Sequence, residues 1–323
     1  MNNALLHKTS LPGVVTRAEV APSIGLNEAF MPFSPLKLHA FLTDSPVEPI
    51  LEDAQFDLLT IAGSEFFLVW SRSEGGTLDR AVALEGHTVQ KPTPAFRALL
   101  EQALTLLAED DSVFPIVHAY SPALAYVRPA PNCDRPITSC TVPDFPQMSF
   151  LSGIAGRHVP PLTVIAESSA LLLAENIFHE SVHQYVNHQL LTQQLLAERY
   201  RSEDSPEVDI SWRRNSDGTP QRWQIDRVLH AATVYTNLLA WRYRVLRRPD
   251  LSDVERRAFS EAALAGLRSA RELSVALEDN IDCFSPLGAF RVGELTDRCA
   301  MYGQLVESSV NPTVNSLTHK ASA

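Results

Sequence analysis

The residues with the clearest chemical potential are two histidines four positions apart, His179 and His183, within a His-Glu-x-x-His segment. On a helix, residues at this spacing lie one turn apart, with Cβ atoms about 5–6 Å from each other. Two imidazoles so placed can bring ring nitrogens to about 2.0–2.1 Å from one metal ion. Glu180 adjoins the first histidine and can hold a water molecule or orient a ligand. The motif therefore predicts a metal-dependent enzyme with His179 and His183 as ligands and Glu180 as a catalytic residue, rather than a structural pair of surface histidines.

Such a site needs a third ligand, which the sequence leaves open. A metzincin places a third histidine six residues after the second, but position 189 is glutamine, and His188 is rotated off the ligand face of a helix. A gluzincin takes a glutamate from a later helix, yet the glutamates that follow stand in no such context: Glu198, Glu203 and Glu207. His230 is the remaining candidate, although a single histidine on a helix more often belongs to the core.

The elements that must position these residues are mostly helical. After Ser168 there is neither Gly nor Pro until Pro206, which predicts a long helix carrying the motif. Three more long helices are expected after it. The first is the uninterrupted run Gln221–Arg248, ended by Pro249, the second is opened by a capping box at Ser252–Glu255 and the last by Ser285-Pro286. Upstream, Thr93 and Pro94 begin a helix to Glu109, and the apolar residues of 49–70 suggest further helical packing.

Between Val113 and Ile165 the chain is rich in proline and β-branched residues, which predicts short strands and one small sheet, with a strand at Leu162–Ala166 just before the motif. The fold class expected is thus α+β and mostly helical, a single domain with a small central β region followed by four long helices. Its expected parts are an irregular arm (1–45), a helical and β region (46–165), a helical metal-binding region (166–307) and a frayed tail (308–323).

Composition excludes several partners. The formal net charge of −11 would repel a phosphate backbone, so nucleic acid is an unfavourable partner. No stretch of 18 or more apolar residues occurs, which argues against a membrane span. The amino terminus lacks a basic segment followed by a long apolar run, so no secretory signal is expected and the cytoplasm is the predicted location.

Four segments together resemble a known family, the HExxH-type 2-oxoglutarate-dependent peptide β-hydroxylases, which tailor ribosomally made peptide natural products. The segments are the motif at 179–183, Ser-Trp-Arg at 211–213, Leu-His-Ala at 229–231 and Ser-Pro-Leu-Gly at 285–288. The resemblance covers roughly the carboxy-terminal half. It departs from the family pattern in two places: no proline follows Ser211, and alanine replaces glycine after His230.

The resemblance implies a mononuclear Fe(II) site with His179, His183 and His230 as ligands, and 2-oxoglutarate and O₂ as cosubstrates. The reaction would be hydroxylation of an unactivated side-chain carbon in a peptide substrate. The distal carboxylate of 2-oxoglutarate needs a cation, for which the bidentate fork of arginine is suited. Arg227, three residues before His230, and Arg213 are the candidates, each of which could equally form a surface salt bridge.

Two other functions fit the same motif. A zinc metallopeptidase would use Glu180 as general base on a zinc-bound water and would need an edge strand for an extended peptide, for which Leu162–Ala166 is available. A non-catalytic peptide-binding protein with a vestigial site is the other alternative, against which the intact motif argues.

Overall fold

The computed structural model describes residues 46, 48–142, 145–160, 163–215 and 217–310, and the predicted arm and most of the predicted tail lie outside them. The fold is α+β and mostly helical, as predicted. The chain divides into two compact units, with the division after Tyr185. Within the described ranges, no helix is both long and apolar enough to span a membrane.

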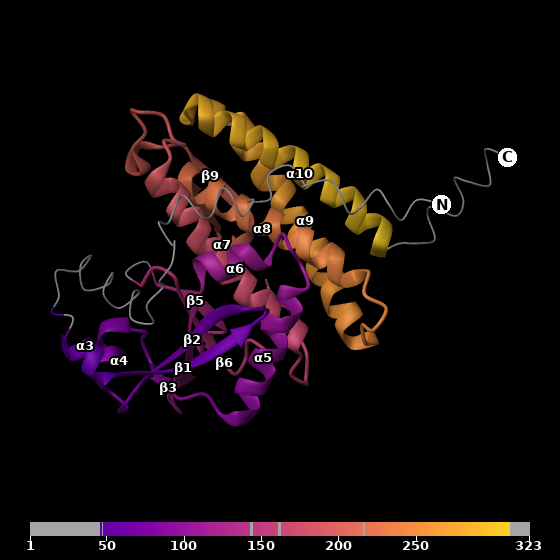
Figure 1. The fold of residues 1–323 in the computed structure, drawn as a ribbon. Coiled ribbons are helices and arrows are strands. Elements are labelled where there is room, and N and C mark those ends of the chain that lie inside the picture. The colour runs from indigo at the N-terminus through magenta and orange to yellow at the C-terminus, as the bar shows by residue number, and fades with distance from the viewer. Residues whose placement is uncertain (1–45, 47, 143–144, 161–162, 216, 311–323) are drawn as a thin grey trace. The chain divides into compact units, whose positions relative to one another are not determined.

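The first unit is built on a six-stranded mixed sheet, coloured indigo to magenta in Figure 1. Its strand order is β1-β2-β4-β6-β5, with β3 also paired to β4. The β2–β4 and β4–β6 pairs are parallel, whereas the two end pairs, β1–β2 and β5–β6, are antiparallel. The strands are β1 Ala54–Ile61, β2 Ser64–Ser71, β3 His87–Gln90, β4 Ala123–Pro129, β5 Ser139–Thr141 and β6 Met148–Ser152.

The helical packing expected for residues 49–70 is wrong except at its start. A short helix α3, Glu48–Asp53, is followed directly by the β1–β2 hairpin. The hairpin turns at Ala62 and Gly63, both with positive φ, as a two-residue turn between antiparallel strands requires. The run Phe66–Trp70 of β2 is buried throughout. A strand that is buried on both faces is apolar at every position, so its sequence shows no alternation of apolar and polar residues.

Three helices accompany this sheet: α4 Thr77–Val82, α5 Pro94–Ala108 and α6 Phe114–Tyr120. The predicted start of α5 is confirmed, because the Thr93 side chain accepts a hydrogen bond from Phe96 N at 3.2 Å. The strand expected over residues 113–120 is wrong, since α6 occupies them. Pro115 suits the first turn of a helix, and the apolar side chains of α6 are buried, which outweighs their β propensity.

The last part of the first unit leads into the motif helix. A small hairpin, β7 His158–Val159 and β8 Thr163–Val164, lies where the Leu162–Ala166 strand was predicted, and of the described residues 163–166 of that segment the first two are in a strand. Helix α7, Ala170–Thr192, follows and carries His179 and His183 in its middle, as predicted. The division between the two units falls inside this helix.

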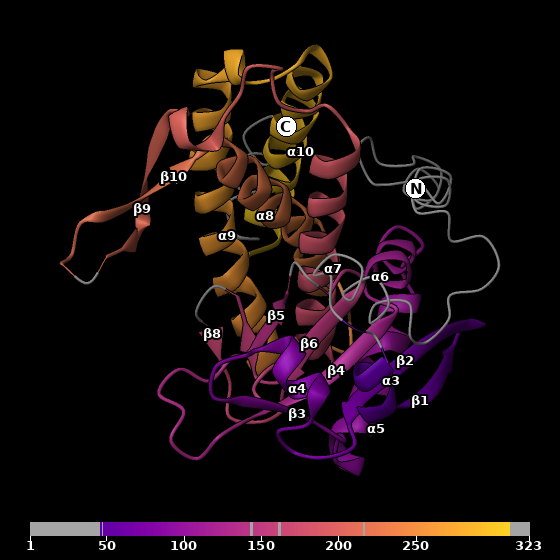
Figure 2. The same cartoon turned by 90° about the vertical axis from the view of Figure 1, so that its left-hand side faces the viewer.

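The second unit contains three long helices, orange to yellow in Figure 1, and a β9–β10 hairpin that extends away from them in Figure 2. Ser211 in β9 donates its backbone N–H to Glu272 of α9 at 3.0 Å. The hairpin was not predicted, and it occupies the first residues of a run expected to be helical from Gln221. The elements are η1 Ser202–Asp204, β9 Glu207–Arg214, β10 Pro220–Gln224, α8 Ile225–Leu246, α9 Asp253–Asp279, η2 Ile281–Cys283 and α10 Pro286–Val310.

Two of the sequence signals in this unit have direct structural counterparts. The capping box at the start of α9 is confirmed, because Ser252 and Glu255 exchange side chain to backbone hydrogen bonds. The Ser-Pro-Leu-Gly segment begins α10, where Ser285 Oγ accepts from Gly288 N at 3.0 Å. A side chain at Gly288 would overlap the carbonyl oxygen of Leu195, so this glycine permits a close backbone approach.

Candidate metal centre

Helix α7 presents the two histidines on the accessible side of an otherwise buried helix. From Leu171 to Val186 every residue is buried except His179, His183 and Tyr185, which are half-buried. Tyr185 packs edge-to-face against Tyr120, with ring centroids 5.4 Å apart. The two histidines are therefore the side chains of this stretch that offer nitrogen atoms to a ligand from outside.

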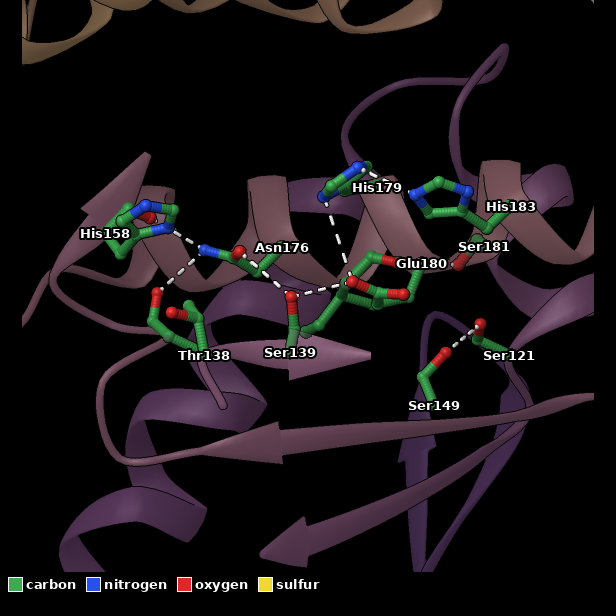
Figure 3. A network of polar contacts seen from close by, with 12 residues as sticks. Ser121, Thr138, Ser139, Ser149, His158, Asn176, His179, Glu180, Ser181 and His183 are labelled. Atoms are coloured by element: carbon green, nitrogen blue, oxygen red, sulfur yellow. Dashed lines mark hydrogen bonds and ion pairs between the residues drawn. The ribbon is translucent and has the colours of Figure 1, made fainter. Parts of the chain in front are cut away.

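The imidazoles of His179 and His183 point toward each other (Figure 3). Their ring centroids are 4.6 Å apart, and the two Nε2 atoms are separated by 2.9 Å. Two ligand atoms that bind one ion at right angles, each at about 2.1 Å, lie about 3 Å from each other. The separation of the two nitrogens thus fits neighbouring positions around a single metal ion.

Glu180 lies on the opposite side of the motif, toward the sheet. Its side chain is 4% exposed, and Ser139 Oγ of β5 lies 2.7 Å from its Oε1 (Figure 3). The distance from the same carboxyl oxygen to His179 Nδ1 is 3.8 Å, longer than a hydrogen bond. Burial raises the pKa of Glu180 to about 7, against the smaller lowering effect of the Ser139 hydrogen bond.

A buried amide completes this network. Asn176 lies one turn before Glu180, and its amide nitrogen is 2.7–3.0 Å from three carbonyl oxygens, those of Ala155, His158 and Leu172, so one of its two N–H hydrogens is shared. Its Oδ1 lies 3.2 Å from Ser139 Oγ and can only accept. The single hydroxyl hydrogen of Ser139 cannot serve both Asn176 and Glu180. Ser139 therefore donates to one of them at a time, and its bond to Glu180 Oε1 is the one that lowers the pKa of this carboxyl group, against the larger raising effect of burial.

His230 lies in the second unit, in the second turn of α8, and is half-buried. Burial lowers its pKa to about 4, while the charge of Asp226, one turn earlier, acts in the opposite direction. Asp226 is in turn held by Tyr200, whose hydroxyl donates to Oδ1 at 2.9 Å, and by Ser202 Oγ at 3.2 Å. A neutral imidazole is the form that binds a metal. Because the two units are described separately, the role of His230 as third ligand stays a prediction.

Neither arginine proposed for the cosubstrate is buried. Arg227 is exposed and its guanidinium stacks over the indole of Trp223, 4.4 Å from the ring centroid. Arg213 is exposed on β9. The tryptophan of the Ser-Trp-Arg segment has a packing role, since Trp212 meets Trp223 and Tyr235 edge-to-face at 6.4 and 6.2 Å. A function of Arg227 or Arg213 in 2-oxoglutarate binding stays a prediction.

Sequence reasoning missed Ser139, which contacts Glu180, and Asn176, which contacts Ser139. Asn176 could have been found, because it precedes Glu180 by four residues and so shares its face of the helix. Ser139 lies 41 residues away from Glu180 and gives no local signal.

Across the described residues, no group of three or more His, Cys, Asp or Glu side chains lies close enough to hold a metal.

The sequence was also compared with known proteins. No protein-family model matches it, and no curated protein matches it significantly.

Proposed function

We propose that this chain is a non-haem Fe(II)- and 2-oxoglutarate-dependent oxygenase that hydroxylates a side-chain carbon of a peptide, as a tailoring enzyme for natural products. The observation that supports it is the His179–His183 pair, whose Nε2 atoms are 2.9 Å apart, together with a Glu180 that is buried and hydrogen-bonded to Ser139 of β5. The two nitrogens fit one ion, and His230 is proposed as its third protein ligand. Bound iron, with 2-oxoglutarate and O₂, supplies oxidation of an unactivated C–H bond.

In this proposal the chain's own residues bind the metal ion and hold Glu180 in place. His179 and His183 hold the ion from one face, so that the remaining positions are left for small oxygen ligands. Ser139 holds the buried Glu180 by a hydrogen bond, and Asn176 contacts Ser139. A carboxyl group engaged by Ser139 is less available to activate a metal-bound water, which favours a function other than hydrolysis.

The cosubstrate carboxylate is assigned to Arg227 or Arg213. Arg227 would have to leave the indole of Trp223 to form a bidentate pair, whereas the exposed Arg213 would lose only water. Arg213 is therefore the candidate whose recruitment costs less.

The experiment is metal analysis of protein purified without oxygen, followed by detection of succinate after addition of 2-oxoglutarate and O₂. Iron at about one equivalent and succinate formation stimulated by a peptide are the expected results. Protein that binds iron but forms no succinate with its cognate peptide would refute the proposed cosubstrate.

A zinc metallopeptidase with Glu180 as general base is the second candidate. The observation that favours it is the raised pKa of Glu180, about 7, because a general base works best when its pKa is near the working pH. A Glu180→Gln variant separates the two functions, since the carboxamide has nearly the same shape and should retain the metal. Peptidase activity that is present in the wild type and lost in this variant would favour the zinc enzyme.

A further inference from the structure

Strand β5 ends the six-stranded sheet and pairs on one side only, with β6. The direction of its backbone groups follows from one hydrogen bond: Ser152 N donates to Thr138 O at 2.9 Å, so the Thr138 carbonyl points at β6. In an antiparallel pair, successive residues point alternately toward and away from the partner. Cys140 therefore faces β6, whereas the backbone N–H and C=O groups of Ser139 and Thr141 face outward.

Those outward groups have no hydrogen-bond partner in the part of the chain that the structure describes. Ser139, Cys140 and Thr141 are all half-buried, so the edge is reachable from solvent. Ser139 and Thr141 are two residues apart, and their donors and acceptors therefore repeat at about 6.8 Å, twice the rise of an antiparallel strand. An extended polypeptide is the ligand whose own donors and acceptors repeat at this distance.

The same edge lies beside the histidine pair. The Ser139 side chain points to α7 and contacts Glu180, the neighbour of His179. In Figure 3 the imidazoles of His179 and His183 lie beyond β5, on the side opposite to Ser149 of β6. A strand added to β5 would lie about 4.8 Å beyond it, on that same side. Alternate side chains of the added strand would point toward α7, as Ser139 does.

We propose that β5 is the docking edge for an extended peptide, which pairs with the outward groups of Ser139 and Thr141 and thereby passes one of its side chains before the His179–His183 pair. The inference rests on the proposed function in naming a peptide as the substrate. Main-chain pairing supplies affinity that is independent of sequence, and the side chains on the α7 face supply selection. The strand assigned to this role is thus β5 and not the Leu162–Ala166 segment.

The test uses a pair of variants at Thr141. Proline there removes an outward N–H and no bond to β6, so the sheet should be kept, as proline is tolerated at the open side of an edge strand. Alanine at the same position keeps the N–H and serves as the control. The probe is a peptide selected from a random 12-residue phage library against the full-length chain in EDTA, after depletion of the library on the Thr141→Pro variant.

Binding of this peptide to the wild type and to Thr141→Ala should be equal, and binding to Thr141→Pro about tenfold weaker, the effect of roughly one hydrogen bond. Hydrogen exchange of the Ser139 and Thr141 amides in the wild type should slow when the peptide is added, a readout that does not depend on how the proline variant folds. A depleted library that yields no binder, equal binding to all three proteins, or unchanged exchange at both amides would overturn the proposal. Because these are binding measurements on metal-free protein, their failure is distinct from an absence of succinate.

Discussion

Glu180 lies where its ionised form is penalised, and the stability of the metal-free protein should therefore depend on pH. Its pKa is about 7 in the folded protein, against an ordinary value of 4.5. Below about pH 4.5 both the folded and the unfolded chain hold the proton. Between the two pKa values the unfolded chain releases its proton first, so the free energy of unfolding falls as pH rises and is fully reduced above pH 7.

The size of this decrease follows from the two pKa values of Glu180. They differ by about 2.5, and a difference of one in pKa corresponds to about 1.36 kcal/mol, so the free energy of unfolding falls by about 3 kcal/mol in total. About 2.5 kcal/mol of this should be lost between pH 5 and pH 8, because at pH 5 the unfolded chain is already largely ionised and at pH 8 the folded one is too. A Glu180→Gln variant does not titrate, and its amide oxygen can still accept from Ser139, so it should lack this dependence.

Urea unfolding of both proteins in EDTA at pH 5 and pH 8 measures the effect. The free energy of unfolding of Glu180→Gln minus that of the wild type should increase by about 2.5 kcal/mol from the lower to the higher pH. Titrating groups that do not interact with Glu180 are common to both proteins and cancel in this difference. A difference that is the same at both pH values would refute the environment assigned to Glu180.

Three further predictions concern the metal, the helical unit and the cosubstrate. His183→Ala should abolish stoichiometric iron binding, measured by mass spectrometry of the anaerobically purified protein, with unchanged circular dichroism. Gly288→Ala should destabilise the protein by several kcal/mol because the added Cβ overlaps a backbone carbonyl oxygen, whereas Gly293→Ala, with nothing within 4 Å, should be neutral or stabilising by up to about 1 kcal/mol in thermal unfolding. Arg213→Ala should raise the 2-oxoglutarate concentration needed for half-maximal succinate formation more than Arg227→Ala does, and equal wild-type behaviour of both would place the clamp elsewhere.

Local signals in the sequence predicted the helices well. The caps at Thr93 and Ser252 are visible in the sequence because a cap involves residues only a few positions apart. Helix α6 was predicted as a strand, and strands β1 and β2 were predicted as helical. A short apolar segment contains too few residues for its periodicity to distinguish a buried helix from a buried strand. The β9–β10 hairpin was missed although β9 carries a strand signal, because Val208, Ile210 and Trp212 alternate with polar residues. Its partner β10 is mostly polar and shows no such alternation.

The candidate site shows the same division between local and distant information. The His179–His183 pair follows from helical spacing alone, and the structure has their nitrogens adjacent. The orientation of Glu180 does not follow from spacing, because it depends on a serine in a strand that precedes the helix by some thirty residues. No pattern within the motif indicates which strand will pack on the helix.

The motif alone therefore predicts two metal ligands but not the chemistry. In a His-Glu-x-x-His helix, the same glutamate can be a base for water or a buried anchor, and its neighbours decide which. Here a hydroxyl on β5 contacts the carboxyl group on the sheet side of the helix, and an amide oxygen on α7 contacts the same hydroxyl. Freeing that carboxyl would require breaking a hydrogen bond within a buried network, which is costly. A Ser139→Ala variant removes the anchor: gain of peptide hydrolysis in zinc-loaded protein would mean that Ser139 restrains a base, whereas unchanged metal content without hydrolysis agrees with the anchoring role that the oxygenase proposal gives to Glu180.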